Sequence, residues 1–296
     1  METIEKIKAV WKLLRLEHGL MLFLAVLSGA IVAAGFTSVL SHPLLVLFSF
    51  LSVVFLEGSV FALNDYVDVD IDRENKRIDR PLVSGIVSPT VALILFLLFF
   101  PLSLVFAFLI NLLCFMIVVI TGFLSIAYDF KLKKIKLVGN FYIAYTMAIP
   151  FVFGALTMRQ NLYGLNPSVF FLSLISFVAG VGREIMKDIM DYRGDSLQGV
   201  TSFVTYLGVK RTKLLVVSLY LFAVLLGSVP FISKSFSPYY FNFVYLFFML
   251  LADILFLVTI RDLLIREDVN YSFHRVLTLF SLLLGLFAFL LGAVFR

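Results

Sequence analysis

The sequence is short of charge and of cysteine. Charged residues make up only 15% of its 296 residues, and Cys114 is the single cysteine. One cysteine excludes an intramolecular disulfide framework and a cysteine-based metal site. So little charge, without a basic segment interleaved with aromatic residues, argues against nucleic-acid binding. The sequence also lacks a polar stretch long enough to form a separate soluble domain.

Apolar residues dominate instead. They make up 61% of the chain and include 34 Phe, which is typical of a polytopic membrane protein. A transmembrane helix needs about 20 mostly apolar residues. Nine stretches qualify, near residues 19–36, 43–63, 88–107, 111–130, 138–156, 167–186, 213–232, 239–260 and 274–295. We therefore predict an all-α integral membrane protein, a single domain over residues 1–296, with nine transmembrane helices around a central cavity.

The distribution of charge supports this division, because Lys and Arg concentrate in the cytoplasmic loops of membrane proteins. All but three of the 24 Lys and Arg fall on one side of the predicted spans. The 19 acidic residues lie on that side or inside spans, so we expect a cytoplasmic N-terminus and an active site that faces the cytoplasm. The net charge of +5 then reflects orientation and attraction to anionic lipid headgroups. Residues 1–18 alternate charged and apolar side chains, which predicts an amphipathic segment at the cytoplasmic surface.

Two acidic clusters share one spacing. They are Asp65, Asp68 and Asp72 at the end of the second span, and Asp188, Asp191 and Asp195 at the end of the sixth. Residues at i, i+3 and i+7 lie on one helix face, so each cluster directs three carboxylates the same way. Such carboxylates repel by roughly 3 kcal/mol a pair at an effective dielectric near 20 unless cations neutralise them. Because Mg²⁺ prefers oxygen ligands and completes its shell with phosphates, we predict a divalent-metal diphosphate site on which both clusters converge.

Basic and amide groups adjoin the clusters. Asn64 adds a neutral oxygen ligand before the first Asp, and Arg77 and Arg80 follow the first cluster in a loop that contains Pro81 and Gly85. Arginine binds phosphate oxygens in a bidentate manner, so this loop is expected to fold over a diphosphate. Lys187 precedes the second cluster, and the segment YDFKLKK supplies Tyr128 and Lys133 as further phosphate donors. Taken alone, that segment would be ordinary positive-inside anchoring.

These motifs resemble those of the UbiA-type intramembrane prenyltransferases. That family carries an NDxxDxxxD motif after its second helix, a DxxDxxxD-like motif after its sixth, and nine helices. Residues 64–72 match the first motif in full. The segments LLRLEHG, DRPLVSG and YDFKLK are similar to further family segments, with Asp79 and Asp129 in place of the usual Asn and Ser. The resemblance spans nearly the whole chain.

The resemblance implies transfer of a prenyl group from an isoprenyl diphosphate, with Mg²⁺ as cofactor, two ions in number. The implied metal ligands are Asn64, Asp65, Asp68, Asp72, Asp188, Asp191 and Asp195. The implied diphosphate-binding residues are Asn64, Arg77, Arg80, Tyr128, Lys133 and Lys187. The residues expected to carry catalysis are Asp68, Asp72, Asp191, Asp195, Lys133 and Arg80.

The acceptor stays open at this point. GREIMKDIMDYRGD resembles the matching segment of the digeranylgeranylglyceryl phosphate synthases, which implies geranylgeranyl diphosphate as donor and geranylgeranylglyceryl phosphate as membrane-soluble acceptor in ether-lipid synthesis. An alternative is an aromatic acceptor of the 4-hydroxybenzoate type, for quinone synthesis. An alternative from another class is a cation or organic-ion transporter. Transporter sites lie near the bilayer midplane, where only Glu57 and Asp253 are candidates.

Overall fold

The structure is a computed structural model that describes residues 2–159, 161, 163, 165–197 and 199–295. Across these residues it is helical, apart from an isolated β-bridge between Ile135 and Thr201. The α-helices are α1 (Glu2–Leu14), α2 (Leu16–Ala34), α3 (Phe36–Leu40), α4 (Pro43–Val67), α5 (Val69–Glu74), α6 (Pro89–Ile110), α7 (Leu112–Phe130), α8 (Lys136–Arg159), α9 (Pro167–Leu197), α10 (Phe203–Ile232), α11 (Phe243–Ile265) and α12 (Tyr271–Val294). Two short 3₁₀ helices are η1 (Leu132–Lys134) and η2 (Lys234–Phe236).

The prediction of an all-α membrane protein is confirmed. Within the described ranges, nine helices are long and apolar enough to cross a membrane, namely α2, α4 and α6 to α12. Two helices extend well beyond their predicted spans: α9 continues to Leu197, and α10 begins at Phe203 with a kink at Gly208. Hydropathy marks only the apolar part of a helix, so it missed these polar turns. Gly208 has a φ of 73°, in the left-handed region that favours glycine.

The junction of α6 and α7 is a single residue, Asn111. Its backbone is extended, with φ −173° and ψ 169°, so it ends one helix and begins the next. The Asn111 side chain accepts a hydrogen bond from the Cys114 amide at 2.9 Å, which satisfies one of the free N–H groups at the start of α7. The break implied between the predicted spans 88–107 and 111–130 is therefore present, and it is confined to Asn111.

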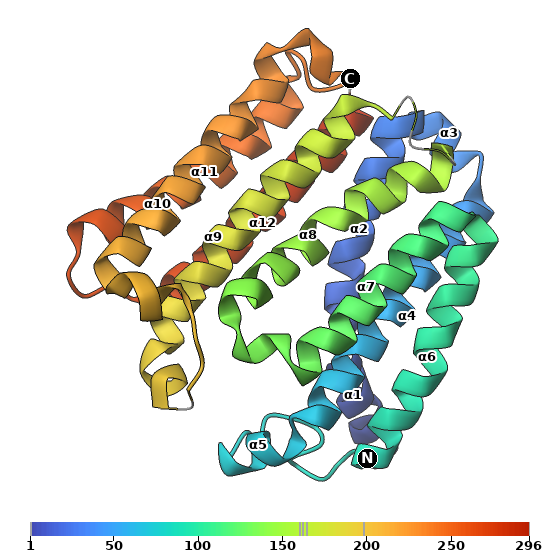
Figure 1. Ribbon diagram of the computed structural model, residues 1–296. Coiled ribbons are helices and arrows are strands. Elements are labelled where there is room, and N and C mark those ends of the chain that lie inside the picture. Colours follow the sequence, from blue (N-terminus) through green and yellow to red (C-terminus); the bar gives the residue numbers. More distant parts are fainter. Residues whose placement is uncertain (1, 160, 162, 164, 198, 296) are drawn as a thin grey trace. The chain divides into compact units, whose positions relative to one another are not determined.

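Residues 1–24 and 42–131 form one compact unit, called unit 1 below. In it α4 packs against α6, α7 and α1, and α5 continues from the end of α4 (Figure 1). A small core beneath α1 joins Ala9 and Leu13 to Leu82, Val87 and Ala92. This core fixes the loop between α5 and α6 against the bundle, and the loop carries Arg77 and Arg80.

Residues 25–41 and 132–296 form the other compact unit, unit 2. Here α9 packs against α8, α10 and α12, and α11 packs against α10 and α12 (Figure 1). The second half of α2 crosses α8 at two glycines. A Cβ on Gly29 would lie 1.9 Å from the Phe151 carbonyl oxygen, and one on Gly154 would lie 1.9 Å from that of Val26. Only glycine permits this approach, a common device where membrane helices cross.

Candidate active site

The first acidic cluster lies where α4 meets α5. Helix α4 ends at Val67, α5 begins at Val69, and Asp68 between them has φ −90° and ψ 0°. The predicted helix is therefore interrupted at Asp68, although the amides of Asp68 and Asp72 still donate to the carbonyls four residues earlier. The backbone turn at Asp68 nonetheless leaves Asp65 and Asp72 close enough to share a partner, Arg80.

Asp65 lies beneath two guanidinium groups. It is only 2% exposed. Arg15 Nη2 donates to its Oδ1 at 3.1 Å, and Arg80 Nη1 donates to the same oxygen. Arg80 Nε also lies 3.7 Å from Oδ2 of Asp72. A carboxylate this deeply buried is costly unless it is paired, so two arginines make Asp65 the anchor of the local charge network.

Arg15 was not among the predicted site residues. It lies between α1 and α2 with a φ of 43°, and its guanidinium carbon is 4.1 Å above the centre of the Phe61 ring. Burial lowers the pKa of Arg15, and the Asp65 carboxylate opposes that shift. The contact joins residues 50 positions apart, so helical periodicity gives no sign of it. The segment LLRLEHG, which is similar to a family segment, was the only signal in the sequence.

Asn64 links the first cluster to α7. Its Nδ2 donates to Asp68 Oδ2 at 3.3 Å and to Asp129 Oδ1 at 2.8 Å. Asp129 is 1% exposed and comes from the end of α7. It is a second residue missed by the sequence analysis, although the departure YDFKLK from the family pattern had drawn attention to it. Three helices, α4, α5 and α7, thus supply carboxylates to this region.

The outer part of the first cluster is open to solvent. Arg77 donates to Asp79 through Nε at 3.1 Å and Nη2 at 3.3 Å, and its Nη1 lies 4.0 Å from Asp72. The hydrogen bonds from Arg77 lower the pKa of Asp79, and the same bonds raise the pKa of Arg77. Arg77 thus bridges the exposed loop and the buried carboxylate of Asp72.

The second cluster lies on α9, which is continuous through all three aspartates. Asp188 is 2% exposed. Asn140 Nδ2 donates to its Oδ2 at 2.6 Å, and Lys136 Nζ lies 3.4 Å from its Oδ1. Lys136 Nζ is also 3.9 Å from Oδ2 of Asp191, whose side chain is 37% exposed. Lys136 and Asn140 were not predicted as site residues, although Lys136 follows Lys133 by one helical turn.

An ionic trio precedes this cluster on α9. Arg183 Nη1 lies 2.9 Å from Glu184 Oε1, and Lys187 Nζ lies 3.4 Å from Glu184 Oε2. Glu184 is buried, whereas Lys187 is 37% exposed at its side chain. Lys187, predicted to bind phosphate, therefore already pairs with an acid on its own helix.

The remaining predicted residues fall in different parts of the chain. Tyr128 is half-buried near the end of α7 in unit 1, and Lys133 is half-buried in η1 in unit 2. The backbone there is held by the Lys136 amide, which donates to the Thr201 carbonyl at 2.9 Å. Asp195 lies in α9, but its side chain is outside the described residues. The roles predicted for these residues, and the convergence of the two clusters, stay predictions.

Oxygen ligands for a hard cation are present, but not as a complete cage. Among the described side chains, no three from Asp, Glu, His and Cys stand together as a metal-binding group. Mg²⁺ is usually bound by one or two carboxylates and completed by water and substrate phosphates. The donor chemistry at each cluster, carboxylate with an adjacent Asn, fits that pattern.

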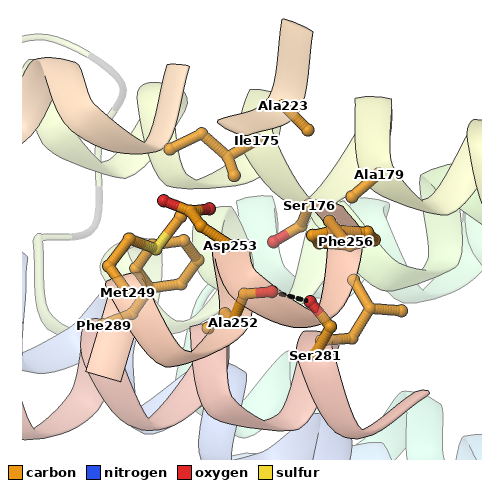
Figure 2. A pocket seen from close by; sticks show the side chains of 12 residues that line it. Ile175, Ser176, Ala179, Ala223, Met249, Ala252, Asp253, Phe256, Ser281 and Phe289 are labelled. Carbon is orange, nitrogen blue, oxygen red and sulfur yellow. Dashed lines mark hydrogen bonds between the residues drawn. The ribbon is translucent and has the colours of Figure 1, made fainter. Parts of the chain in front are cut away.

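A cavity in unit 2 lies away from the second cluster. It has a volume of about 30 Å³ and opens between α9, α10, α11 and α12 (Figure 2). Asp253, predicted to lie deep, points into it, and its Oδ1 has no hydrogen-bond partner. Ala179 on the cavity wall precedes Asp188 by nine residues of α9, a rise of about 14 Å. With a single acid, mostly apolar walls and no basic residue in its lining, the cavity is unsuited to binding a diphosphate.

Comparison with known proteins identifies the family of the chain. The family model for the UbiA prenyltransferase family matches residues 21–282. A digeranylgeranylglyceryl phosphate synthase from Archaeoglobus fulgidus is 38% identical over 97% of this chain and 96% of its own length. A solved structure concerned with digeranylgeranylglyceryl phosphate synthase in membranes has a TM-score of 0.78 and 30% identity, covering 98% of this chain and 99% of that one.

A more distant structure shares the fold alone. It is a UbiA homolog from Archaeoglobus fulgidus bound to DMAPP and Mg²⁺, with a TM-score of 0.60 and 18% identity, covering 95% of this chain and 98% of the other. The family model covers most of the chain, and the near relatives match it almost from end to end. The chain therefore belongs to the UbiA prenyltransferase family.

Proposed function

We propose that the protein transfers a geranylgeranyl group from geranylgeranyl diphosphate to the free hydroxyl of geranylgeranylglyceryl phosphate, in ether-lipid synthesis. The observation that carries the proposal is the pair of buried aspartates, Asp65 and Asp188, each held by basic groups beside more accessible carboxylates. The name of the 38% identical relative supports this choice of donor and acceptor. Membership of a prenyltransferase family sets the ion-transport alternative aside.

In this proposal the aspartates of each cluster have different roles. Asp68 and Asp72, with Asn64, would hold one Mg²⁺ ion, and Asp191 and Asp195 a second. When bound, Mg²⁺ neutralises the negative charge of the diphosphate and of the departing pyrophosphate. The contacts favour a supporting role for Asp65 and Asp188, because two arginines already bind Oδ1 of Asp65, and Lys136 and Asn140 contact the two oxygens of Asp188. The distant homolog that binds DMAPP and Mg²⁺ supports the choice of metal.

The chain's own basic groups favour departure of the pyrophosphate. Arg80 has a side chain only 17% exposed, so its charge is less screened than that of a surface arginine. As the bond between C1 and the diphosphate oxygen breaks, the pyrophosphate takes the bonding electrons and its negative charge grows. We assign the stabilisation of that charge to Arg80, Arg77 and Lys133. The acceptor hydroxyl oxygen then bonds to C1, and its proton passes to the departing pyrophosphate.

Both clusters are proposed to face the cytoplasm. The basis is the distribution of Lys and Arg, all but three of which lie on one side of the nine spans. Water would capture the allylic cation, so the loops that carry Arg77, Arg80 and Lys133 must limit its access during reaction.

The test is a product assay with the purified protein. It receives labelled geranylgeranyl diphosphate, Mg²⁺ and either geranylgeranylglyceryl phosphate or 4-hydroxybenzoate, and the products are identified by mass. We expect an ether-linked product with the first acceptor and none with the second. Chelation with EDTA is expected to stop turnover, and added Mg²⁺ to restore it. Transfer to 4-hydroxybenzoate alone would overturn the proposed acceptor class.

A further inference from the structure

Helix α1 has two apolar faces. Ala9 and Leu13 are buried in the core shared with Leu82 and Val87. Ile4, Ile7 and Trp11 form a stripe on another face, because residues at i, i+3 and i+7 align along a helix. These three side chains are 62%, 63% and 50% exposed. The buried face accounts for the packing of α1, and the exposed stripe requires a different explanation.

The position and charge of α1 identify what covers this stripe. A single residue, Arg15, separates α1 from α2, which is a candidate membrane span, so the C-terminal end of α1 lies at a membrane surface. Lys8 and Lys12 are exposed beside the stripe. The first 15 residues carry four basic and two acidic side chains. A short helix with an apolar stripe flanked by lysines is typical of a segment that lies in an anionic lipid interface.

We propose that the stripe of Ile4, Ile7 and Trp11, with Lys8 and Lys12, is a binding surface for anionic lipid headgroups. The apolar side chains enter the boundary between headgroups and acyl chains, and the two ammonium groups bind lipid phosphates. Because α1 already packs on the bundle through Ala9 and Leu13, the lipid binds an ordered helix and does not have to fold it.

Lipid binding at α1 acts on the first acidic cluster through two contacts. Arg15 immediately follows the last residue of α1 and donates to Asp65. The buried face of α1 also packs on Leu82 and Val87, in the same loop as Arg80. The position of α1 therefore sets both guanidinium groups around Asp65. This second step rests on the proposed function, since it predicts that anionic lipid strengthens diphosphate binding.

Trp11 is the only tryptophan of the chain and reports directly on this surface. The full-length protein is placed in vesicles of one anionic and four neutral phospholipids, with bromine atoms near the headgroup end of the acyl chains of either the anionic or the neutral lipid. At equal mole fractions of brominated lipid, we expect brominated anionic lipid to quench Trp11 fluorescence at least about twofold more strongly, because each nearby lysine attracts anionic lipid several-fold.

The control variants remove equal charge from different places. Lys8→Gln with Lys12→Gln is expected to abolish the excess quenching by anionic lipid. Lys210→Gln with Arg211→Gln, two exposed residues of α10, is expected to leave it intact. Equal quenching by the two brominated lipids, absence of quenching by either, or an excess that survives the Lys8 and Lys12 changes would each overturn the lipid-binding surface.

The activity assay tests the second step separately. In vesicles with anionic lipid, the Lys8→Gln, Lys12→Gln variant is expected to show a KM for geranylgeranyl diphosphate raised about threefold or more, with kcat nearly unchanged, and wild-type protein in purely neutral vesicles is expected to behave likewise. An unchanged KM would overturn the coupling to Asp65. Lack of any wild-type turnover would instead count against the proposed function, and the Trp11 quenching result would stand by itself.

Discussion

The two acidic clusters have the same spacing but are built with different partners. In unit 1, Asp65 is held by the guanidinium groups of Arg15 and Arg80. In unit 2, Asp188 is held by one ammonium group, that of Lys136, and one neutral amide, that of Asn140. In both clusters the first aspartate is buried and occupied. The two clusters thus share a buried first aspartate, called the anchor below, whereas the chemical groups that contact it differ.

The comparison also separates roles within one motif. The aspartate three residues after each anchor, Asp68 or Asp191, is more accessible than the anchor itself. Matched spacing had suggested that all three carboxylates of a cluster bind metal alike. Burial sets the first aspartate of each cluster apart from Asp68 and Asp191, which supports the ligand roles proposed for these two, whereas Asp72 is itself buried and lies 3.7 Å from Arg80.

The largest expected effect is on stability, where the two anchors should differ. Asp65→Ala leaves two partly buried arginines without their shared, buried carboxylate; breaking a fully buried pair costs about 3–5 kcal/mol, and we expect a loss near the lower end of that range. Asp188→Ala strands one ammonium and one amide, so we expect a smaller loss of about 2–3 kcal/mol. Denaturant unfolding of both variants measures the difference. Asp70→Ala, whose partner Arg73 is itself half exposed, is the control. Equal losses at Asp65 and Asp188 would remove the distinction between the clusters.

The accessible aspartates should affect turnover and not folding. We expect Asp68→Ala and Asp191→Ala each to lower kcat at least about a hundredfold, because a lost metal ligand removes several kcal/mol of charge stabilisation. Stability should hold or rise, since removing a carboxylate relieves repulsion from its neighbours. The measurement is kcat in saturating Mg²⁺ beside a melting curve. Near wild-type turnover in either variant would end the ligand role of that residue.

Exchanging the basic residues sharpens the comparison further. Arg80 reaches Asp65 and Asp72 with different nitrogens, which a single lysine ammonium does not reproduce. Arg80→Lys is therefore expected to lower kcat/KM for the diphosphate about ten- to a hundredfold, the effect of one charge-assisted hydrogen bond. Lys136→Arg keeps its charge beside Asp188 and should change kcat/KM by less than about threefold. Lys210→Ala serves as a remote control, and equal effects of the two exchanges would contradict the assignment.

The smallest effect concerns the solvent-exposed pair of Arg77 and Asp79. Its hydrogen bonds lower the pKa of Asp79, so the stabilisation is present above the ordinary pKa near 4 and is lost as the pH falls through the lowered value. We expect Asp79→Asn to melt slightly below wild type at pH 7 and together with it below about pH 3. A melting difference that grows in acid would have the wrong sign.

The spans were predictable because each is an apolar run of nearly the right length. Even the one-residue turn between α6 and α7 is marked in the sequence by a polar residue, Asn111. The polar end of α9 was not predictable from hydropathy, because charged residues such as Asp191 and Asp195 lower the hydropathy although the segment is still helical. Spacing identified both clusters. It did not identify the interruption between α4 and α5 at Asp68.

The partners of the aspartates were less accessible to sequence reasoning. Arg15 and Asp65 are 50 residues apart, and Asn140 and Asp188 are 48 apart, so only the packing of helices brings them together. Lys136 lies three residues after the predicted Lys133. To tell which of the two lysines contacts Asp188, one must know where α8 begins. Local patterns thus indicate which carboxylates matter, and tertiary contacts decide what each of them does.

The one-residue junction at Asn111 sets the rotational phase of α7. A helix turns by about 100° per residue, so one inserted residue after Asn111 would rotate all of α7 by that angle. The side chain of Asp129, 18 positions further along, would then no longer point toward Asn64, to which it is hydrogen bonded. The hydrogen bond that steadies the first cluster at one end of α7 is therefore kept in register by a residue at the opposite end, where no loop exists to absorb an insertion.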